Sequence, residues 1–206
     1  MSSNTQNFSI AKRPYRMDSR AAAAARTRES ILEAAEELFT ARAFDEVTIA
    51  DVARAAGVSQ QTVVNHFGSK ERLVLIGMQE RVGPRIEAQR AKVRPGDLDS
   101  VITIVVEDYE VTGRNTLRLL AAAERFETMA EVARYGRDFQ HGWVRQALGP
   151  QLDRLDEQAR EETARLLAVV LDVRTWAQLR FDDERGVEET KRDLRRLLRA
   201  VLASAA

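Results

Sequence analysis

The residues best suited to chemistry in this chain of 206 residues are short amides and hydroxyls between positions 60 and 65. Gln and Asn side chains can donate to and accept from an adenine at the same time, so they suit base edges in the major groove of DNA. They fall on the outer side of a helix whose inner side carries Val63 and Phe67 at i, i+4 spacing. The candidates for base contacts are Gln60, Gln61, Thr62 and Asn65.

Two short helices joined by a tight turn must position these side chains. Thr48 and Ser59 are of the types that cap helix N-termini, and Asp51 completes a capping box with Thr48. Gly57 falls where the first helix must end, because glycine adopts the left-handed cap conformation without strain. The pattern predicts a helix-turn-helix whose second helix enters the major groove. The alternative is a buried helical hairpin with a solvated outer face.

The flanking sequence strengthens the first interpretation. Residues 27–78 resemble the N-terminal DNA-binding domain of the TetR/AcrR family of transcriptional regulators, through the segments ILEAAEELF, TIADVA, AGVS, TVVNHF and SKE and the turn at Phe44-Asp45. The resemblance implies that Thr48 and Lys70 contact backbone phosphates, which set register rather than sequence preference. The family usually has tyrosine at the position of Val64, where it touches the DNA backbone, and valine cannot donate that hydrogen bond.

The expected DNA-binding residues extend beyond the base contacts to the two caps, the histidine that closes the second helix and the lysine that follows it. Together they are Thr48, Ser59, Gln60, Gln61, Thr62, Asn65, His66 and Lys70.

Composition argues against several other classes of protein. The chain has no cysteine, so disulfides and thiolate metal sites are excluded. His66 and His141 fall in different predicted domains, so neither a metal site nor a cofactor is expected. No apolar run reaches the roughly 18 residues of a membrane span, and the start lacks a signal-peptide core. These features predict a cytoplasmic protein without membrane contact.

The net charge bears on the kind of DNA binding. The chain carries 32 basic and 32 acidic residues, a formal net charge of zero. DNA binding requires basic groups near the phosphates rather than an overall basic excess. The balance is mild evidence against tight non-specific binding and suits a modular protein that is basic only locally.

The chain is predicted to be all-α, because it has only 4 Pro and 10 Gly and few β-branched residues alternating at period two. A three-helix helix-turn-helix domain over residues 27–78 precedes a larger helical regulatory and dimerisation domain over residues 79–206. Gly83-Pro84 should kink or break the helix that connects them. The further helices are expected over residues 97–112, 114–124, 126–148, 157–181 and from Gly186.

Residues 1–26 are expected to form an N-terminal arm that is disordered or partly helical. Lys12, Arg13 and Arg16 could reach phosphates or a minor groove beside the reading helix. The favoured interpretation is an inert tail, since charge runs are often only solvated. Ala21–Ala25 could extend the first helix towards the N-terminus.

The family resemblance implies a pocket for a small-molecule effector in the second domain, and such pockets usually have aromatic walls with few polar groups. Asp172 interrupts the most apolar stretch, so it should be paired with an arginine or contact a ligand. For each aromatic residue, ordinary core packing is the alternative. The candidate ligand-binding residues are Tyr109, Phe126, Met129, Phe139, Trp143, Asp172 and Trp176.

A homodimer is predicted from the last two long helices. Residues 157–181 are apolar almost all round, so both sides of that helix should be covered. The final helix carries an apolar stripe that could complete a four-helix bundle with a second copy. A monomer is the alternative. The predicted interface residues are Leu171, Leu194, Leu197, Leu198 and Val201.

These features predict a homodimeric, ligand-responsive transcriptional repressor that binds a near-palindromic operator in double-stranded DNA. One alternative is an architectural DNA binder that takes no ligand. Another is a protein-interaction module that has lost its DNA. The third is a small-molecule-processing enzyme, against which stands the lack of a phosphate loop, a nucleophile pattern or enough histidines.

Overall fold

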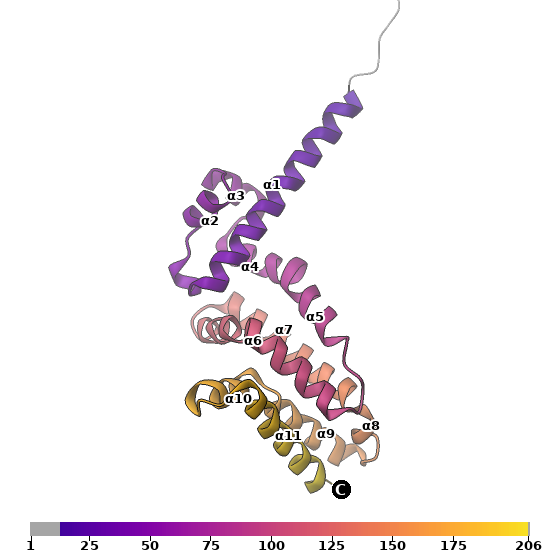
Figure 1. Ribbon diagram of the computed structural model, residues 1–206. Coiled ribbons are helices and arrows are strands. Elements are labelled where there is room, and N and C mark those ends of the chain that lie inside the picture. The colour runs from indigo at the N-terminus through magenta and orange to yellow at the C-terminus, as the bar shows by residue number, and fades with distance from the viewer. Residues whose placement is uncertain (1–12, 206) are drawn as a thin grey trace, which may run out of the picture.

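The computed structural model describes residues 13–205, which are helical without any strand, as expected. The N-terminal part comprises α1 (Arg13–Ala41), the short 3-10 turn η1 (Phe44–Glu46), α2 (Ile49–Ala55), α3 (Gln60–Phe67), α4 (Lys70–Gly77), η2 (Met78–Val82) and α5 (Gly83–Arg90). The larger part comprises α6 (Leu98–Ala123), α7 (Glu127–Ala147), α8 (Gly149–Leu152), α9 (Glu157–Val170), α10 (Val173–Ala177), η3 (Gln178–Asp182) and α11 (Val187–Ser204). Figure 1 shows the first part stacked on one end of the second.

The helix-turn-helix is held by a small core of its own. The inner faces of α1 to α4 meet there, and burial of their apolar side chains is the main stabilising contribution. Its fully covered members include Ile31, Leu32, Val47, Val52, Val63 and Leu73.

The connection to the second part is a continuous helix with a wide turn, and not a break at Gly83-Pro84. Proline lacks a backbone N–H and its ring collides with the carbonyl four residues earlier. The chain adopts a π turn over Met78–Val82 instead, in which Gly83 donates to the carbonyl of Met78. The boundary expected between residues 78 and 79 therefore falls inside a helical connector.

The second part is built on α6, α7, α9, α10 and α11 around one large apolar core. Gly113 was expected to end or bend a helix, and it does not end one, since α6 runs unbroken from Leu98 to Ala123. Gly113 is buried because the Trp176 ring packs directly on it, where any side chain would overlap the ring. The glycine is needed for close packing rather than for a turn.

The expected single helix over residues 157–181 is also wrong. The chain leaves helical geometry at Leu171 and Asp172, between α9 and α10. The Asp172 carboxylate accepts from the backbone N–H of Arg174 at 2.8 Å and so caps α10. Its guanidinium partner is also Arg174, at 3.6 Å. The acidic residue in the apolar stretch thus starts a new helix.

Of the two expectations for the N-terminal arm, disordered or partly helical, the structure shows helix from Arg13 onwards. Lys12 and the rest of residues 1–12 lie outside the described residues. Ala21–Ala25 extend α1 as expected.

The two parts are joined by a small apolar cluster. Phe44 of η1 packs edge-on against Phe126, with ring centroids 4.9 Å apart, and both contact Met129 in the same cluster. Arg125 pairs with Asp45 at 2.8 Å beside it. No helix in residues 13–205 is both long and apolar enough to cross a membrane.

Gly113→Ala should lower the free energy of unfolding by about 1–3 kcal/mol, because the new methyl group must displace Trp176. The control is Gly142→Ala in α7, where a Cβ meets nothing within 4 Å and the helix should gain stability. Urea unfolding followed by circular dichroism measures both. Equal effects of the two substitutions would contradict the packing role assigned to Gly113.

Candidate nucleic-acid interface and effector cavity

The candidate reading helix α3 is fixed at both ends by local chemistry. Ser59 caps it by accepting from the backbone N–H of Thr62 at 3.1 Å. Gly57 precedes it with a φ of +68°, the left-handed conformation expected for the turn. Val63 and Phe67 are buried in the domain core. The helix is thus held by its inner face, and its outer face is free for contacts.

The outer face of α3 presents amides to solvent. Gln60, Gln61 and Asn65 are exposed, and Gln61 donates to the Asn65 side-chain oxygen at 2.8 Å. This bond orients the two amides together, with the Gln61 oxygen and the Asn65 nitrogen left to pair outwards. An acceptor and a donor on adjacent turns match the adenine edge in the major groove.

The other candidate DNA-binding residues on α3 are less accessible for contact with DNA. Thr62 is half-buried, and its hydroxyl lies 2.8 Å from that of Ser59. His66 is half-buried, with its ring tilted against that of Phe67. Val64, by contrast, is 40% exposed on the outer face and brings no hydrogen-bond donor.

Thr48 is engaged in the predicted capping box. Its hydroxyl donates to the Asp51 carboxylate at 2.7 Å and accepts from the Asp51 backbone N–H at 3.1 Å. The hydroxyl and the backbone N–H of Thr48 both donate to the Asp51 carboxylate, and these two bonds lower the pKa of Asp51 below its usual value. Because a hydroxyl has one proton to donate, Thr48 can contact a phosphate only by releasing Asp51.

Lys70 is engaged within the domain, which the sequence did not reveal. Its ammonium donates to the carbonyls of Phe44 and Val47 at 2.9 and 3.1 Å and lies 4.1 Å from the centre of the Phe44 ring. Two of its three protons are therefore used to hold η1 against α4, and one remains for a phosphate.

Arg42 and Arg54, which the sequence analysis passed over, flank the cap of α2. Both pair with Asp51, at 3.7 and 3.2 Å, and the Arg54 side chain is 76% exposed. Exposed guanidiniums beside a helix-turn-helix suit phosphate oxygens. Arg42 directly follows α1 and Arg54 lies in the last turn of α2, and these positions were the available signal.

A cavity of about 820 Å³ lies between the two parts of the chain. Its walls come from α1, the η2–α5 connector, α6, α7 and the start of α10. They combine apolar side chains such as Ile86, Leu120 and Phe139 with a larger number of polar and charged residues. Of the predicted ligand residues, Tyr109, Phe139 and Asp172 line it.

The polar groups at the base of this cavity form hydrogen bonds with one another. Arg90 donates to Asp108 at 2.8 and 3.0 Å and to the Gln140 oxygen at 3.2 Å. Burial raises the pKa of Tyr109 to about 12 even though the nearby Arg90 charge opposes that shift. Tyr109 therefore stays neutral and donates to the carbonyl of Leu171 at 3.1 Å.

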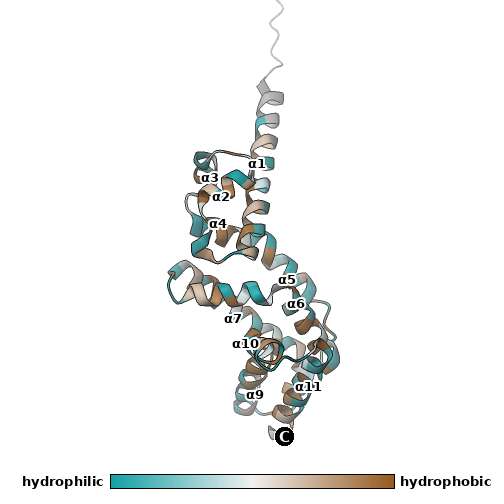
Figure 2. Cartoon of the chain, turned by 60° about the vertical axis from the view of Figure 1, so that its left-hand side comes forward, coloured by the Kyte–Doolittle hydropathy of each residue, from teal (hydrophilic) through white to brown (hydrophobic). Residues whose placement is uncertain are grey.

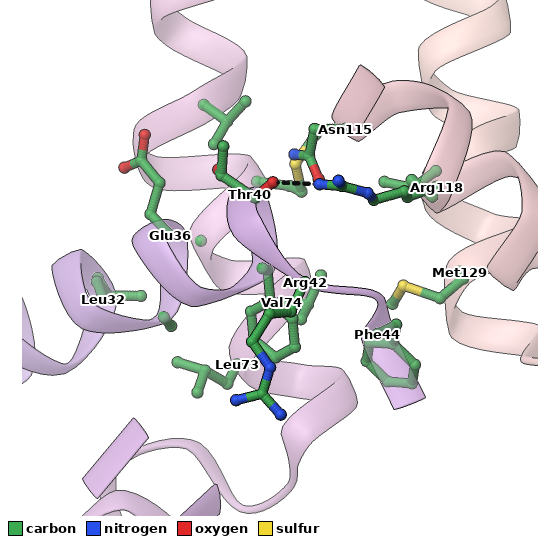
Figure 3. Close-up of a pocket in the computed structure, with 16 residues that line it drawn as sticks. Leu32, Glu36, Thr40, Arg42, Phe44, Leu73, Val74, Asn115, Arg118 and Met129 are labelled. Atoms are coloured by element: carbon green, nitrogen blue, oxygen red, sulfur yellow. Dashed lines mark hydrogen bonds between the residues drawn. The ribbon is translucent and has the colours of Figure 1, made fainter. Parts of the chain in front are cut away.

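A second, smaller cavity of about 70 Å³ lies at the joint between α1, α4 and α6, and Met129 lines it (Figure 3). The other predicted aromatics line neither cavity. Phe126 packs in the cluster that joins the two parts. Trp143 donates to the Arg90 carbonyl at 3.0 Å, and Trp176 donates to Glu110 at 3.0 Å. Core packing, the alternative interpretation, describes these three.

Three of the predicted interface residues face inwards. Leu171, Leu194 and Leu198 are buried in the chain's own core, because the apolar stripe of α11 packs on α6 and α9. The prediction that these three residues form a dimer interface is therefore wrong. Leu197 remains 41% exposed and Val201 is half-buried. On α9, Leu166 and Val169 are 52% and 63% exposed, and they were not among the predicted residues.

A helix-turn-helix is thus joined to a larger helical domain, with a cavity between the two parts. Residues 31–75 match the family model described as bacterial regulatory proteins, tetR family. The helix-turn-helix of this chain is therefore of the TetR type.

The curated relative is the HTH-type transcriptional regulator AlkX of Mycobacterium tuberculosis, 45% identical over 60 residues. That alignment spans 29% of this chain and 26% of the relative, so it covers only a quarter of that protein.

Solved structures share the fold over most of the chain. A transcriptional regulator from Rhodococcus sp. Rha1 is 17% identical with a TM-score of 0.68, over 86% of this chain and 96% of that one. MexZ, a repressor responsible for antibiotic resistance in Pseudomonas aeruginosa, is 23% identical with a TM-score of 0.58, over 87% and 94%. At these identities the likeness establishes the fold alone.

Lys70→Ala should destabilise the helix-turn-helix by about 1–3 kcal/mol, because the carbonyls of Phe44 and Val47 lose their shared donor. Arg72→Ala, an exposed change one half-turn further along α4, should have little effect. Thermal unfolding of the two variants measures this. Unchanged stability in Lys70→Ala would mean that the lysine is free for DNA.

Proposed function

We propose that the protein is a sequence-specific DNA-binding transcriptional repressor that acts as a homodimer and responds to a small-molecule effector. The observation that carries the proposal is the outer face of α3. Gln60, Gln61 and Asn65 are exposed together on a helix whose opposite face is locked into the domain core. Such a helix can enter a major groove without unfolding any part of its domain.

The contacts within the domain indicate which residues would bind bases and which would bind phosphates. Gln60, Gln61 and Asn65 face bases, with Thr62 at bases or backbone. Arg54 joins Lys70 and Thr48 as a candidate for phosphate contacts, and its side chain is 76% exposed. Phosphate contacts position the domain, whereas base contacts carry the sequence preference.

The cavity of about 820 Å³ supports a response to an effector. Its size and the apolar side chains in its walls suit a drug-sized molecule. One wall belongs to α1 of the helix-turn-helix, through Glu33, Glu37 and Thr40, and the others belong to α6 and α7. A ligand there touches both parts at once. If it favours another angle between them, it lowers operator affinity, and by linkage DNA lowers ligand affinity equally.

The exposed apolar side chains of α9 and α11 support a dimer. Leu166, Val169 and Leu197 leave apolar surface in water that a second copy of the same helices can cover. A two-fold dimer places two reading helices on the half-sites of a near-palindrome.

Selection of bound duplexes from a random pool, at near-physiological salt, tests the proposal. A near-palindrome should be recovered, with half-sites separated by about one helical turn. Salt-sensitive binding without a preferred sequence would instead identify an architectural DNA binder. Absence of binding would contradict the proposed function.

Asn65→Ala should relax preference at one position of each recovered half-site by about 1–3 kcal/mol, because the base loses its amide partner. Arg54→Ala is the comparison variant, and it should lower the affinity for all duplexes by a similar factor. Fluorescence anisotropy on the operator and its single-base variants measures both. A uniform loss in Asn65→Ala would show that this residue does not read a base.

The double substitution Leu166→Glu and Val169→Glu should convert the dimer to a monomer at micromolar concentration, because it places charge in the apolar interface. Val111→Glu is the control, since Val111 is 80% exposed on α6 at the cavity and away from α9. Sedimentation velocity measures the mass. If the doubly substituted protein remained a dimer, the α9 surface would be excluded as the dimer interface.

A further inference from the structure

Val64 is a large apolar side chain that the reading helix α3 leaves in water. It is 40% exposed, whereas Val63 and Phe67 of the same helix are buried in the domain core. Within the described part of the chain, the other exposed large apolar side chains lie on α6, α7, α9 and α11, and they are Val111, Tyr135, Leu166, Val169 and Leu197. Val64 is thus the one such side chain that the helix-turn-helix contributes among the described residues.

The exposed apolar side chains outside α3 have other surroundings. Tyr135 has a polar partner, because its hydroxyl donates to the Glu87 carboxylate at 3.3 Å. Val111 lines the large cavity, and those of α9 and α11 form the proposed dimer surface. Figures 1 and 2 show α3 at the end of the molecule remote from α9 and α11. A second copy packed on those two helices alone would leave Val64 uncovered.

Val64 lies beside the amides that are candidates for base contacts. It follows Gln60 by four residues and Gln61 by three, and side chains at these spacings are neighbours on a helix surface, with Cβ atoms about 5–6 Å apart. Successive residues are about 100° apart around the axis, so Thr62 falls on the opposite side of the pair formed by Gln61 and Asn65. The outer face of α3 therefore presents a hydroxyl, two amides and an apolar side chain side by side.

The Val64 side chain is held in a defined position. The N–H of Gly68 donates to the Val64 carbonyl at 2.8 Å, which closes the last turn of α3. A valine in a helix occupies one χ1 rotamer about nine times in ten, because both of its γ-methyl groups branch from Cβ. A contact made by this side chain therefore costs little conformational entropy.

The chemistry of α3 favours a base edge rather than a phosphate as the group that meets Val64. Between Gln60 and Phe67 the helix has no lysine, arginine, aspartate or glutamate. A valine has no donor to offer a phosphate oxygen, and phosphates are bound through donors and positive charge. The major groove contains one apolar feature that differs between base pairs, which is the C5 methyl group of thymine.

We infer that Val64 contacts the C5 methyl group of a thymine and selects that base in each half-site of the operator. The inference rests on the proposed function and adds an apolar specificity contact to the amide contacts. Adenine, the partner of thymine, is the base whose edge the amides of Gln61 and Asn65 match. Neighbouring base pairs are about 3.4 Å apart. Side chains that are neighbours on α3 can therefore meet the same A·T pair or the next one.

Deoxyuridine provides a probe for this contact, because it differs from thymidine only by lacking the C5 methyl group. Each thymine of the operator selected by the unmodified protein is replaced in turn, in one half-site at a time. Affinity of the full chain is measured by fluorescence anisotropy. At one thymine of each half-site, the replacement should lower affinity about fourfold, the factor expected when one buried methyl group is lost.

Val64→Ala and Val64→Ile form a matched pair that assigns the contact to this residue. Val64→Ala removes both γ carbons, so deoxyuridine at the sensitive position should cause little further loss. Val64→Ile keeps the branched apolar side chain and should retain a loss of about fourfold. Alanine is the best helix former and isoleucine resembles valine in helix propensity, so both variants should keep α3. Circular dichroism checks that they do.

Three results would overturn the inference. They are half-sites without a thymine, a deoxyuridine scan without a sensitive position, and a sensitive position that responds equally in Val64→Ala and the unmodified protein. If Val64→Ala also weakened all duplexes by one factor, that third result would place the valine against the DNA backbone. Each of these results leaves operator binding by the unmodified protein intact. Failure of the unmodified protein to select any duplex would instead refute the proposed function.

Discussion

The buried guanidinium of Arg90 is the contact on which the arrangement of the two parts depends. Arg90 is 2% exposed at the C-terminal end of α5 and pairs with the equally buried Asp108 of α6. Burial of two charges costs several kcal/mol unless their hydrogen bonds are complete. Gln140 accepts a further bond, and Trp143 packs its ring on the guanidinium while donating to the Arg90 carbonyl. The end of α5 is thereby fixed to α6 and α7.

This anchor has a consequence for the reading helix, because α5 continues through the π turn at η2 into α4 of the helix-turn-helix. Arg81 of that turn pairs with Glu29 and Glu36 of α1, so ion pairs tie the connector to the helix-turn-helix domain. The cavity lies between this domain with its connector and α6 and α7, with Arg90 at its base. Under the proposed function, a molecule bound there would contact both parts and so bias the position of α3. Two arrangements that differ in ligand affinity are sufficient to couple effector and operator.

Local chemistry made much of the helix-turn-helix predictable. Thr48, Ser59 and Gly57 act through neighbours within a few residues, so their caps and turn could be inferred without knowledge of the fold. Gly113 could not be interpreted in that way. Its role comes from Trp176, which lies far along the chain, and the sequence suggests only a helix end.

In the candidate sites, too, contacts between residues far apart in the sequence could not be predicted from local pattern. Lys70 was expected at a phosphate, but its carbonyl partners lie more than 20 residues away and could not be inferred from spacing. The periodic apolar stripe of α11 could face its own domain or a partner, and burial of Leu194 and Leu198 settles which side they take. The aromatic residues were equally ambiguous, because core packing and pocket lining have the same helical spacing. The cavity depends on the tertiary arrangement of α1, α5, α6 and α7, which helical spacing does not reveal.

The most direct measurement of the anchoring role of Arg90 is a distance between the two parts of one chain. The chain has no cysteine, so Arg54→Cys on α2 and Arg165→Cys on α9 can carry two spin labels, diluted with unlabelled protein. Double electron–electron resonance should give one narrow distance distribution. Arg90→Lys keeps the charge opposite Asp108 but cannot keep both the paired bonds and the bond to Gln140. The distribution should broaden or shift in that variant. An unchanged narrow distribution would contradict the claim that Arg90 sets the position of the reading helix.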